Sequence, residues 1–373
     1  MNIRFDEHGT AENLKKMIDE VESIDGISSI LILACDGNNF NSETIDPIIL
    51  NRKTPLFGGI FPEVIYESNN YTKGTIVAGC SSFTSVSVVK DLSNSEVDYE
   101  EDIDNVVPGS VQARTMFVFV DGLAKRISSF IDSLFNVFGL DMNYLGGGAG
   151  SLSFEQKPVL FSNQGLLKDA AIIALTDVES GVGVKHGWED VKGPFRVTKA
   201  EQNVIISLDW RPAADIYKEV VEPHSGNSLN PDNFFDTSKG YPFGISKLGS
   251  EMIVRDPISM NPDGSLVCVG EVPENVFVHI LTGSTKTLVD AAKEALDFGE
   301  KNLDEKSQRE TVFVIDCISR VLYLQDNFKQ ELDAISLENI PMIGALTLGE
   351  IANSGRDYLE FYNKTCVIGV LGS

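Results

Sequence analysis

Apolar and polar residues alternate along the chain in a pattern that predicts a mixture of helices and strands. Leu14, Ile18 and Val21 lie at helical spacing, and Thr10 precedes them as an N-cap, so an amphipathic helix is predicted over 11–21. Further helices are predicted near 43–50, 123–138, 285–298 and 325–335, and apolar strands at 30–33, 116–121 and 312–317.

Three segments of the chain share one order of parts. In each, an apolar run stops at an aspartate (Asp36, Asp121 or Asp316), a helix follows, a glycine-containing strand comes next, and an extended stretch leads to a final strand. A strand, a helix and a hairpin can share one sheet face, which predicts internal duplication, with generic α/β alternation as the alternative. The fold class is therefore α/β with mixed (α+β) sheets, in two interdependent halves whose sheets pack under outer helices.

Two other stretches stand outside this pattern. A strand-rich region over 182–281 is broken by a segment rich in Pro, Asn, Gly and Ser at 222–239, a candidate domain boundary or loop. The acidic run 96–104 has few apolar anchors and is interpreted as a solvated loop.

Charge and targeting signals narrow the class of protein. The chain has 30 basic and 55 acidic residues and a net charge of −25, which disfavours nucleic acid and anionic membranes as partners. The first residues lack the features of a signal peptide, and no apolar run could span a membrane, so a cytoplasmic location is expected. The five cysteines are widely spaced and are interpreted as reduced core thiols.

The glycine run 146–150 is the first candidate site. Gly146, Gly147, Gly148 and Gly150 could bring backbone N–H groups close to an anion. A phosphate loop would lead into a helix, however, whereas a strand is predicted after this run. The glycines are therefore interpreted as close backbone packing at the floor of a pocket.

Polar residues at strand ends supply the other candidates. His186 and Trp188 could line an apolar pocket, or His186 could ligate haem iron, with His279 as the second choice. Cys317 lies three residues before Arg320 and near a helix start, which would lower a thiol pKa and permit a reactive cysteine. The remaining candidates are Arg320 and Arg255 for an anionic group, and Glu350 and Asn363 for polar contacts or turn stabilisation.

Taken in order, these motifs resemble those of the FIST family over residues 27–372. The segments that carry the resemblance are Gly146–Ser151, His186-Gly187-Trp188, 197–200, Pro212-Ala213 with Tyr217, Tyr241-Pro242, 254–256, Cys317 with Arg320, Gly349-Glu350 and 363–365. The resemblance implies an N-terminal extension (1–26), a FIST N-like domain (27–215) and a FIST C-like domain (216–373). The chain departs from the family pattern at Ser151, Ser319 and Ala352, and a carboxylate missing at position 151 would change the charge that the pocket prefers.

The resemblance implies an intracellular sensory domain that is not an enzyme. We expect a stand-alone protein that binds an amino acid or another small anionic ligand and signals to a separate protein such as a histidine kinase. No cofactor is expected, apart from haem in the alternative of a nitric-oxide sensor. Two further alternatives are an enzyme that uses Cys317 as nucleophile and an interaction scaffold.

Overall fold

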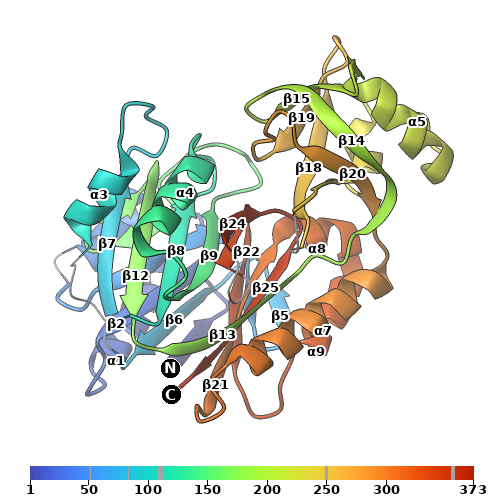
Figure 1. Cartoon of the computed structure of the whole chain (residues 1–373). Helices are drawn as coiled ribbons and strands as arrows, with labels where there is room; N and C mark the ends of the chain where they lie inside the picture. Colours follow the sequence, from blue (N-terminus) through green and yellow to red (C-terminus); the bar gives the residue numbers. More distant parts are fainter. Residues whose placement is uncertain (51, 83, 108–112, 248–250, 354–357) are drawn as a thin grey trace.

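A computed structural model describes residues 1–50, 52–82, 84–107, 113–247, 251–353 and 358–373. Three six-stranded mixed sheets form the body of the molecule, and a small barrel projects from it (Figure 1). The expected α/β class with mixed sheets is confirmed.

The three sheets of the body have the same strand order and sense. Each contains two central parallel strands joined through a helix, a final strand antiparallel to the first of them, and a two-stranded hairpin at one edge. Sheet one contains β1 (Asn2–Asp6), β6 (Thr75–Cys80), β2 (Ser29–Cys35), β3 (Leu56–Phe61), β10 (Leu160–Ser162) and β11 (Gly165–Leu167). Sheet two contains β7 (Thr84–Lys90), β12 (Ala170–Thr176), β8 (Thr115–Asp121), β9 (Asn143–Ala149), β23 (Glu350–Asn353) and β24 (Leu359–Tyr362). Sheet three contains β13 (Glu179–Lys185), β25 (Cys366–Gly372), β21 (Arg309–Cys317), β22 (Met342–Thr347), β4 (Glu63–Tyr66) and β5 (Asn69–Tyr71).

The hairpins are exchanged in a cycle among the sheets. Hairpin β4–β5 follows β3 in sequence but pairs with β22 of sheet three. Hairpin β10–β11 follows β9 and pairs with β3 of sheet one, and β23–β24 follows β22 and pairs with β9 of sheet two. The repeat of strand, helix and hairpin is therefore confirmed, and each hairpin joins the sheet of another copy.

A glycine marks the same register position in every sheet. Gly58, Gly146 and Gly344 pair with Ile32, Val118 and Val314 of the parallel neighbour. A Cβ on each would lie 1.7–2.1 Å from the carbonyl oxygen of that partner, so a side chain does not fit. The terminal aspartates are less regular, since Asp36, Asp121 and Asp316 lie four, three and two residues after those partners.

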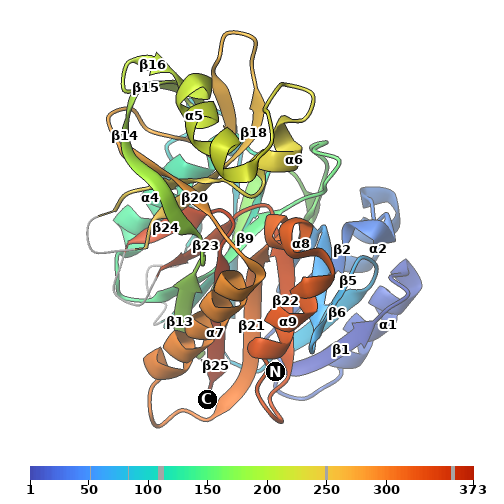
Figure 2. The ribbon, with the colours of Figure 1, turned by 90° about the vertical axis from the view of Figure 1, so that its right-hand side faces the viewer.

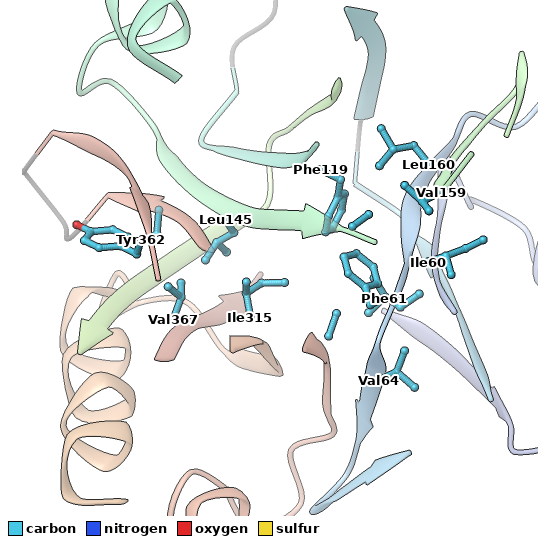
Figure 3. Close-up of a cluster of buried hydrophobic side chains, with 14 of the residues drawn as sticks. Ile60, Phe61, Val64, Phe119, Leu145, Val159, Leu160, Ile315, Tyr362 and Val367 are labelled. Atoms are coloured by element: carbon cyan, nitrogen blue, oxygen red, sulfur yellow. The ribbon is translucent and has the colours of Figure 1, made fainter. Parts of the chain in front are cut away.

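The inner faces of the three sheets meet in one hydrophobic core. Phe57 on β3 packs against Phe117 on β8 with ring centroids 5.8 Å apart, and Phe117 packs edge-on against Phe313 on β21 at 5.2 Å. Figure 3 shows part of this core, where Phe61, Phe119 and other side chains from different sheets converge. Aromatic burial of this kind stabilises the body by joining all three sheets.

Helices cover the outer faces of the sheets (Figure 2). Alternate strand residues point outward, so Val118 packs under α3 and α4 while Val314 packs under α7 and α9. The helices of the body are α1 (Ala11–Glu22), α2 (Ser42–Ile49), α3 (Tyr99–Val106), α4 (Ile127–Phe138), α7 (Thr285–Asn302), α8 (Ile318–Leu324) and α9 (Phe328–Ala334), with short 3₁₀ turns at Asp36–Asn38 and Gln325–Asn327. The predicted Thr10 cap of α1 is present, because its side chain accepts a hydrogen bond from the backbone N–H of Asn13.

The region between β13 and α7 forms the barrel. The long strand β14 pairs with β20 along its first part and with β15 along its last part, which closes the sheet. Helices α5 and α6 cover it, and the ring of Tyr217 packs at a tilt against the rings of Phe234 and Phe243. Its elements are β14 (Glu189–Glu201), β15 (Val204–Leu208), β16 (Arg211–Pro212), α5 (Ala213–Ser225), α6 (Phe234–Ser238), β17 (Phe243–Ile245), β18 (Ile253–Met260), β19 (Leu266–Val269) and β20 (Phe277–Thr282).

Two local interpretations are corrected. The acidic run 96–104 overlaps helix α3, because Asp98 caps its first N–H groups, acidic residues occupy its first turn, and Tyr99 and Ile103 supply a buried face. The segment 222–239 contains the end of α5 and all of α6, so it belongs to the cover of the barrel.

The exchanged hairpins predict that neither half of the chain folds alone. A fragment of residues 1–212 lacks β23 and β24, and its β4, β5 and β13 have no sheet to join. We expect this fragment to lack a cooperative thermal transition by circular dichroism, and co-expression with residues 213–373 to restore it. Intact protein nicked between 212 and 213 is the control, since it should stay folded. A fragment of 1–212 that unfolds cooperatively as a monomer would contradict this prediction.

Candidate functional site

A cavity of about 270 Å³ lies where the barrel meets the second and third sheets. In Figure 1 this junction is above α8 and β24. The cavity is mostly apolar, which is typical of small-molecule sites. From the body it is lined by Gly122, Leu123, Ala124, Lys125, Ile127, Ser128, Leu152, Phe154, Cys317, Ile318, Ser319, Leu322, Thr347, Leu348, Gly349, Phe361 and Asn363, and from the barrel and its helices by Asn203, Phe235, Asp256, Ile258, Cys268, Val269, Gly270 and Glu271.

Two buried polar side chains in the cavity wall have unpaired atoms. In the described part of the chain, five buried side-chain nitrogen or oxygen atoms have no hydrogen-bond partner, and two of these are Asp256 Oδ1 and Asn363 Nδ2. Asp256 is 4% exposed and Asn363 is 2% exposed. Because an unpaired buried polar atom costs about 1–3 kcal/mol, these atoms mark a place where a ligand could bind.

Asp256 and Asn363 are held close together by their sequence neighbours. Asp256 Oδ2 lies 3.0 Å from Lys364 Nζ, and Arg255 Nη1 lies 3.4 Å from Asn363 Oδ1. Arg255 also donates to the backbone oxygens of Glu271 and Phe361. Arg255 and Asp256 are adjacent in sequence, but their side chains bond to other partners.

Arg320 does not face the cavity as an anion-binding group. Its guanidinium is fully buried and makes a bidentate pair with Glu331 at 3.0 and 2.8 Å. It also lies 3.2 Å from Asp316 and donates to the backbone oxygens of His186 and Leu288. Since its nitrogens are occupied within the protein, the expectation that Arg320 grips a ligand is not supported.

The surroundings of Arg320 also account for a cluster of potential metal ligands. Asp316, Glu331 and Cys366 each place a ligand atom within 4.8 Å of the others. Arg320 lies against both carboxylates and supplies the positive charge there. Breaking such a buried ion pair by removing one partner commonly costs about 3–5 kcal/mol, so this cluster is interpreted as structural.

His186 and Trp188 lie in the buried layer behind the cavity wall. The Nδ1 atom of His186 accepts a hydrogen bond from the backbone N–H of Trp188, and burial lowers the pKa of the imidazole to about 4. The indole of Trp188 donates to the backbone oxygen of Lys364. His279 lies on β20 of the barrel, where its Nδ1 atom is 2.9 Å from Asp190 Oδ2.

Neither the cavity lining nor the two candidate histidines, His186 and His279, fit a haem site. Haem iron needs an axial ligand that faces its pocket, and no histidine occurs among the described residues that line the cavity. Cys268 and Cys317 do line it, but burial raises the pKa of both thiols, which opposes thiolate ligation.

Glu350 and Cys317 form a buried polar contact at the edge of the cavity. Burial raises the pKa of Glu350 to about 8, although hydrogen bonds from Cys317 and from the Thr365 backbone oppose this shift. Burial raises the pKa of Cys317, and the charge of Glu350 raises it further. The expectation that Arg320 and the helix start activate this thiol is therefore not supported, because desolvation and the charge of Glu350 hold the thiol pKa above its ordinary value.

The glycine run packs against the cavity wall from behind. Gly146–Ala149 belong to β9, and the described cavity lining does not include any of the four candidate glycines. A Cβ on Gly147 would lie 2.7 Å from the oxygen of Gly349, and one on Gly148 would lie 2.4 Å from the oxygen of Leu348. These glycines therefore allow the segment 347–349, which does line the cavity, to pack closely on β9.

Of the predicted site residues, Cys317 and Asn363 line the cavity, while Arg255, Glu350, Arg320, His186 and Trp188 support it from behind. Sequence reasoning missed Asp256, the apolar lining and the contribution of the barrel strands. Asp256 is adjacent to the candidate Arg255, but the local sequence does not show whether a carboxylate oxygen is free or paired. The apolar lining comes from segments far apart in sequence, and their meeting depends on how the barrel sits on the body.

Comparison with known families gives two adjacent matches. The FIST N domain model matches residues 29–211, and the FIST C domain model matches residues 213–353. No curated protein matches the sequence. Among the described helices, none combines the length and apolar character needed to cross a membrane.

The raised pKa of Glu350 predicts a pH-dependent effect of the change Glu350→Gln. The folded protein binds the Glu350 proton more tightly than the unfolded chain, so this group loses its stabilising effect as pH rises from about 4.5 to about 8. Gln resembles the protonated acid, with a donor for Thr347 Oγ1 and an acceptor for the Thr365 N–H. We expect the melting temperature of the variant relative to wild type to increase from pH 5 to pH 8.5.

The control for this prediction is Glu338→Gln, which removes an exposed carboxylate. It should show little change in relative melting temperature over the same range. A Glu350→Gln variant whose deficit grows with pH would show that the charged carboxylate is the stabilising form.

The buried thiol of Cys317 predicts slow alkylation. At pH 7 we expect iodoacetamide to label Cys317 in the native protein at least about tenfold more slowly than in protein unfolded in guanidinium, because little thiolate is present. Peptide mass spectrometry over time measures this rate. Native labelling of Cys317 that is faster than labelling of the unfolded chain would support an activated nucleophile instead.

Proposed function

Because this chain belongs to the FIST family, whose domains are small-ligand sensory domains of signal transduction, we propose that its ligand binds in the cavity beneath the barrel. The observation that carries this proposal is the combination of an apolar enclosure with two unpaired polar atoms in its wall. A site of this kind recognises a ligand by burying its body and orienting its polar group. The protein acts by binding, and the raised pKa of Cys317 argues against nucleophilic catalysis there.

Helix α8 lies between the cavity and the two chain segments that join the barrel to the body. Ile318, Ser319 and Leu322 of α8 line the cavity. On the same helix, Arg320 donates a hydrogen bond to the backbone oxygen of His186, which lies just before β14. The hydroxyl of Tyr323 donates one to the backbone oxygen of Gly283, which lies just after β20. A ligand that packs against α8 would therefore change the equilibrium between positions of the barrel, provided that it binds one position more tightly.

The signal passes from this junction to another protein. FIST sensory domains bind small ligands and signal to other proteins. We propose that a separate signalling protein, such as a histidine kinase, recognises the position of the barrel. Ligands whose binding depends on a free arginine fit this cavity poorly, because all three guanidinium nitrogens of Arg320 are hydrogen-bonded and neither Arg320 nor Arg255 is among the described residues that line the cavity. An amino acid remains compatible only if its carboxylate finds another partner.

Filling the cavity tests the proposal directly. Ser128 lies in the first turn of α4 and lines the cavity, so Ser128→Phe should occupy part of its volume, whereas Ser128→Ala should leave it open. In a thermal-shift screen with a fragment library, a fragment at ten times its Kd stabilises the protein by about 1.4 kcal/mol. We expect shifts that occur in wild type and Ser128→Ala and are lost in Ser128→Phe.

Two outcomes would contradict the proposed site. One is a library that produces no shift in the wild-type protein. The other is a set of fragments whose shifts persist in Ser128→Phe, which would place binding elsewhere. A melting temperature of unliganded Ser128→Phe close to that of Ser128→Ala shows that the fold tolerates the change.

A further inference from the structure

The ligand class of this cavity follows from the hydrogen bonds that its wall leaves open. Asp256 Oδ1 is an unpaired acceptor and Asn363 Nδ2 is an unpaired donor. Both residues line the cavity and are almost completely buried. A complementary ligand therefore presents an N–H or O–H group beside an oxygen acceptor.

The two cationic side chains beside these atoms, Lys364 and Arg255, already bond to groups of the protein. Asp256 is paired with Lys364 through its other oxygen, at 3.0 Å. Nε and Nη1 of Arg255 donate to three backbone oxygens and to the side-chain oxygen of Asn363, and Arg255 is not among the described residues that line the cavity. A lone carboxylate would meet an unpaired carboxylate oxygen, and a lone ammonium would leave the Asn363 donor without an acceptor. An amino acid offers both groups, but moving its two charges from water into this apolar cavity costs more free energy than moving a neutral amide, so charged head groups are disfavoured.

The geometry of the asparagine fixes which of its atoms is available. Asn363 Oδ1 accepts from Arg255 Nη1, so Nδ2 is the atom that remains free. Gly270 packs beside this pair, where a Cβ would lie 3.1 Å from Asn363 Oδ1 and 3.0 Å from Arg255 Nε. Its φ of +83° also favours glycine, so the backbone leaves room for the polar pair at the cavity wall.

The remaining lining sets the size and polarity of the ligand body. Leu123, Ile127, Phe154, Ile258 and Leu322 contribute apolar surface from both the body and the barrel. The volume of about 270 Å³ lies just below the range of about 300–1,000 Å³ for sites that hold drug-sized molecules. The ligand is therefore compact, with one polar end and an apolar remainder.

We infer that this cavity recognises an uncharged amide head group, either a carboxamide or a cyclic amide, on a small apolar body. The amide N–H donates to Asp256 Oδ1, and its carbonyl oxygen accepts from Asn363 Nδ2. This inference rests on the proposed function, and it names a neutral ligand in place of the amino acid or anion expected from the sequence.

A matched series of four probes tests the head group. The probes are 3-phenylpropanamide, 3-phenylpropanoate, 3-phenylpropylamine and phenylalanine, which share a phenyl ring and a three-carbon chain. Binding to the full-length protein is measured by calorimetry and thermal shift at pH 7. We expect the amide to bind at least about tenfold more tightly than each of the other three, which is the effect of one lost hydrogen bond.

The variant Asn363→Asp tests the proposed hydrogen bond from Asn363 Nδ2 to the amide oxygen of the ligand. It keeps the oxygen that faces Arg255 and replaces the free donor by an acceptor, so we expect affinity for the amide to fall about tenfold and affinity for the amine to rise. The matched control is Asn261→Asp, which adds the same charge to the barrel at a residue outside the cavity lining. Its preference among the probes should equal that of wild type.

The outcomes test two claims separately, namely that the cavity is the ligand site and that its ligand has an amide head group. Binding of the carboxylate, the amine or phenylalanine at least as tightly as the amide overturns the amide assignment. If Ser128→Phe abolishes that binding, the cavity remains the ligand site. Failure of all four probes also overturns the amide assignment, while the fragment screen decides separately whether the cavity binds ligands. An unchanged amide affinity in folded Asn363→Asp excludes Asn363 from recognition.

Discussion

The structure depends on the exchange of hairpins among three sheets. Each sheet takes its edge hairpin from another unit, so hydrogen bonds between strands hold together segments as distant as β4 and β22. Two of the three exchanges cross the boundary between the N-terminal and C-terminal halves, since β4 joins sheet three and β23 joins sheet two. Hydrophobic packing of the inner faces then closes the arrangement. The halves are therefore interdependent for a topological reason, because neither contains a complete set of sheets.

The same arrangement places polar residues in the interior, where their charges are paired. Arg320 is surrounded by Glu331, Asp316 and backbone oxygens, and Lys364 is paired with Asp256. Desolvation makes such groups costly unless their partners are fixed, so they define the positions of β21, α8 and the turn before β25. A rigid layer of this kind supports the cavity wall, while the cavity itself is enclosed by the more separate barrel.

This division of roles explains why charged sequence motifs were poor indicators of ligand contacts. Arg320 and Glu350 were conspicuous because charges in apolar surroundings suggest function. The structure shows that Arg320 serves the packing of α8, and that burial favours the neutral form of Glu350. Asp256 has no distinctive sequence context, yet one of its oxygens is unpaired in the cavity wall. A residue's type indicates what it can bind, but only its surroundings show which of its atoms are free.

The sequence alone determined the class of fold, the repeat of strand, helix and glycine strand, and the family motifs, because periodicity and glycine placement are local properties. It predicted helix α1 with its Thr10 cap, and it excluded a phosphate loop at Gly146–Gly150 because the next element is a strand, β10, and not a helix. The exchange of hairpins, the helix at Tyr99–Val106 and the cavity beneath the barrel were decided by tertiary structure. Each of these features depends on contacts between buried surfaces of segments that are far apart in sequence. A local sequence pattern carries no information about such contacts.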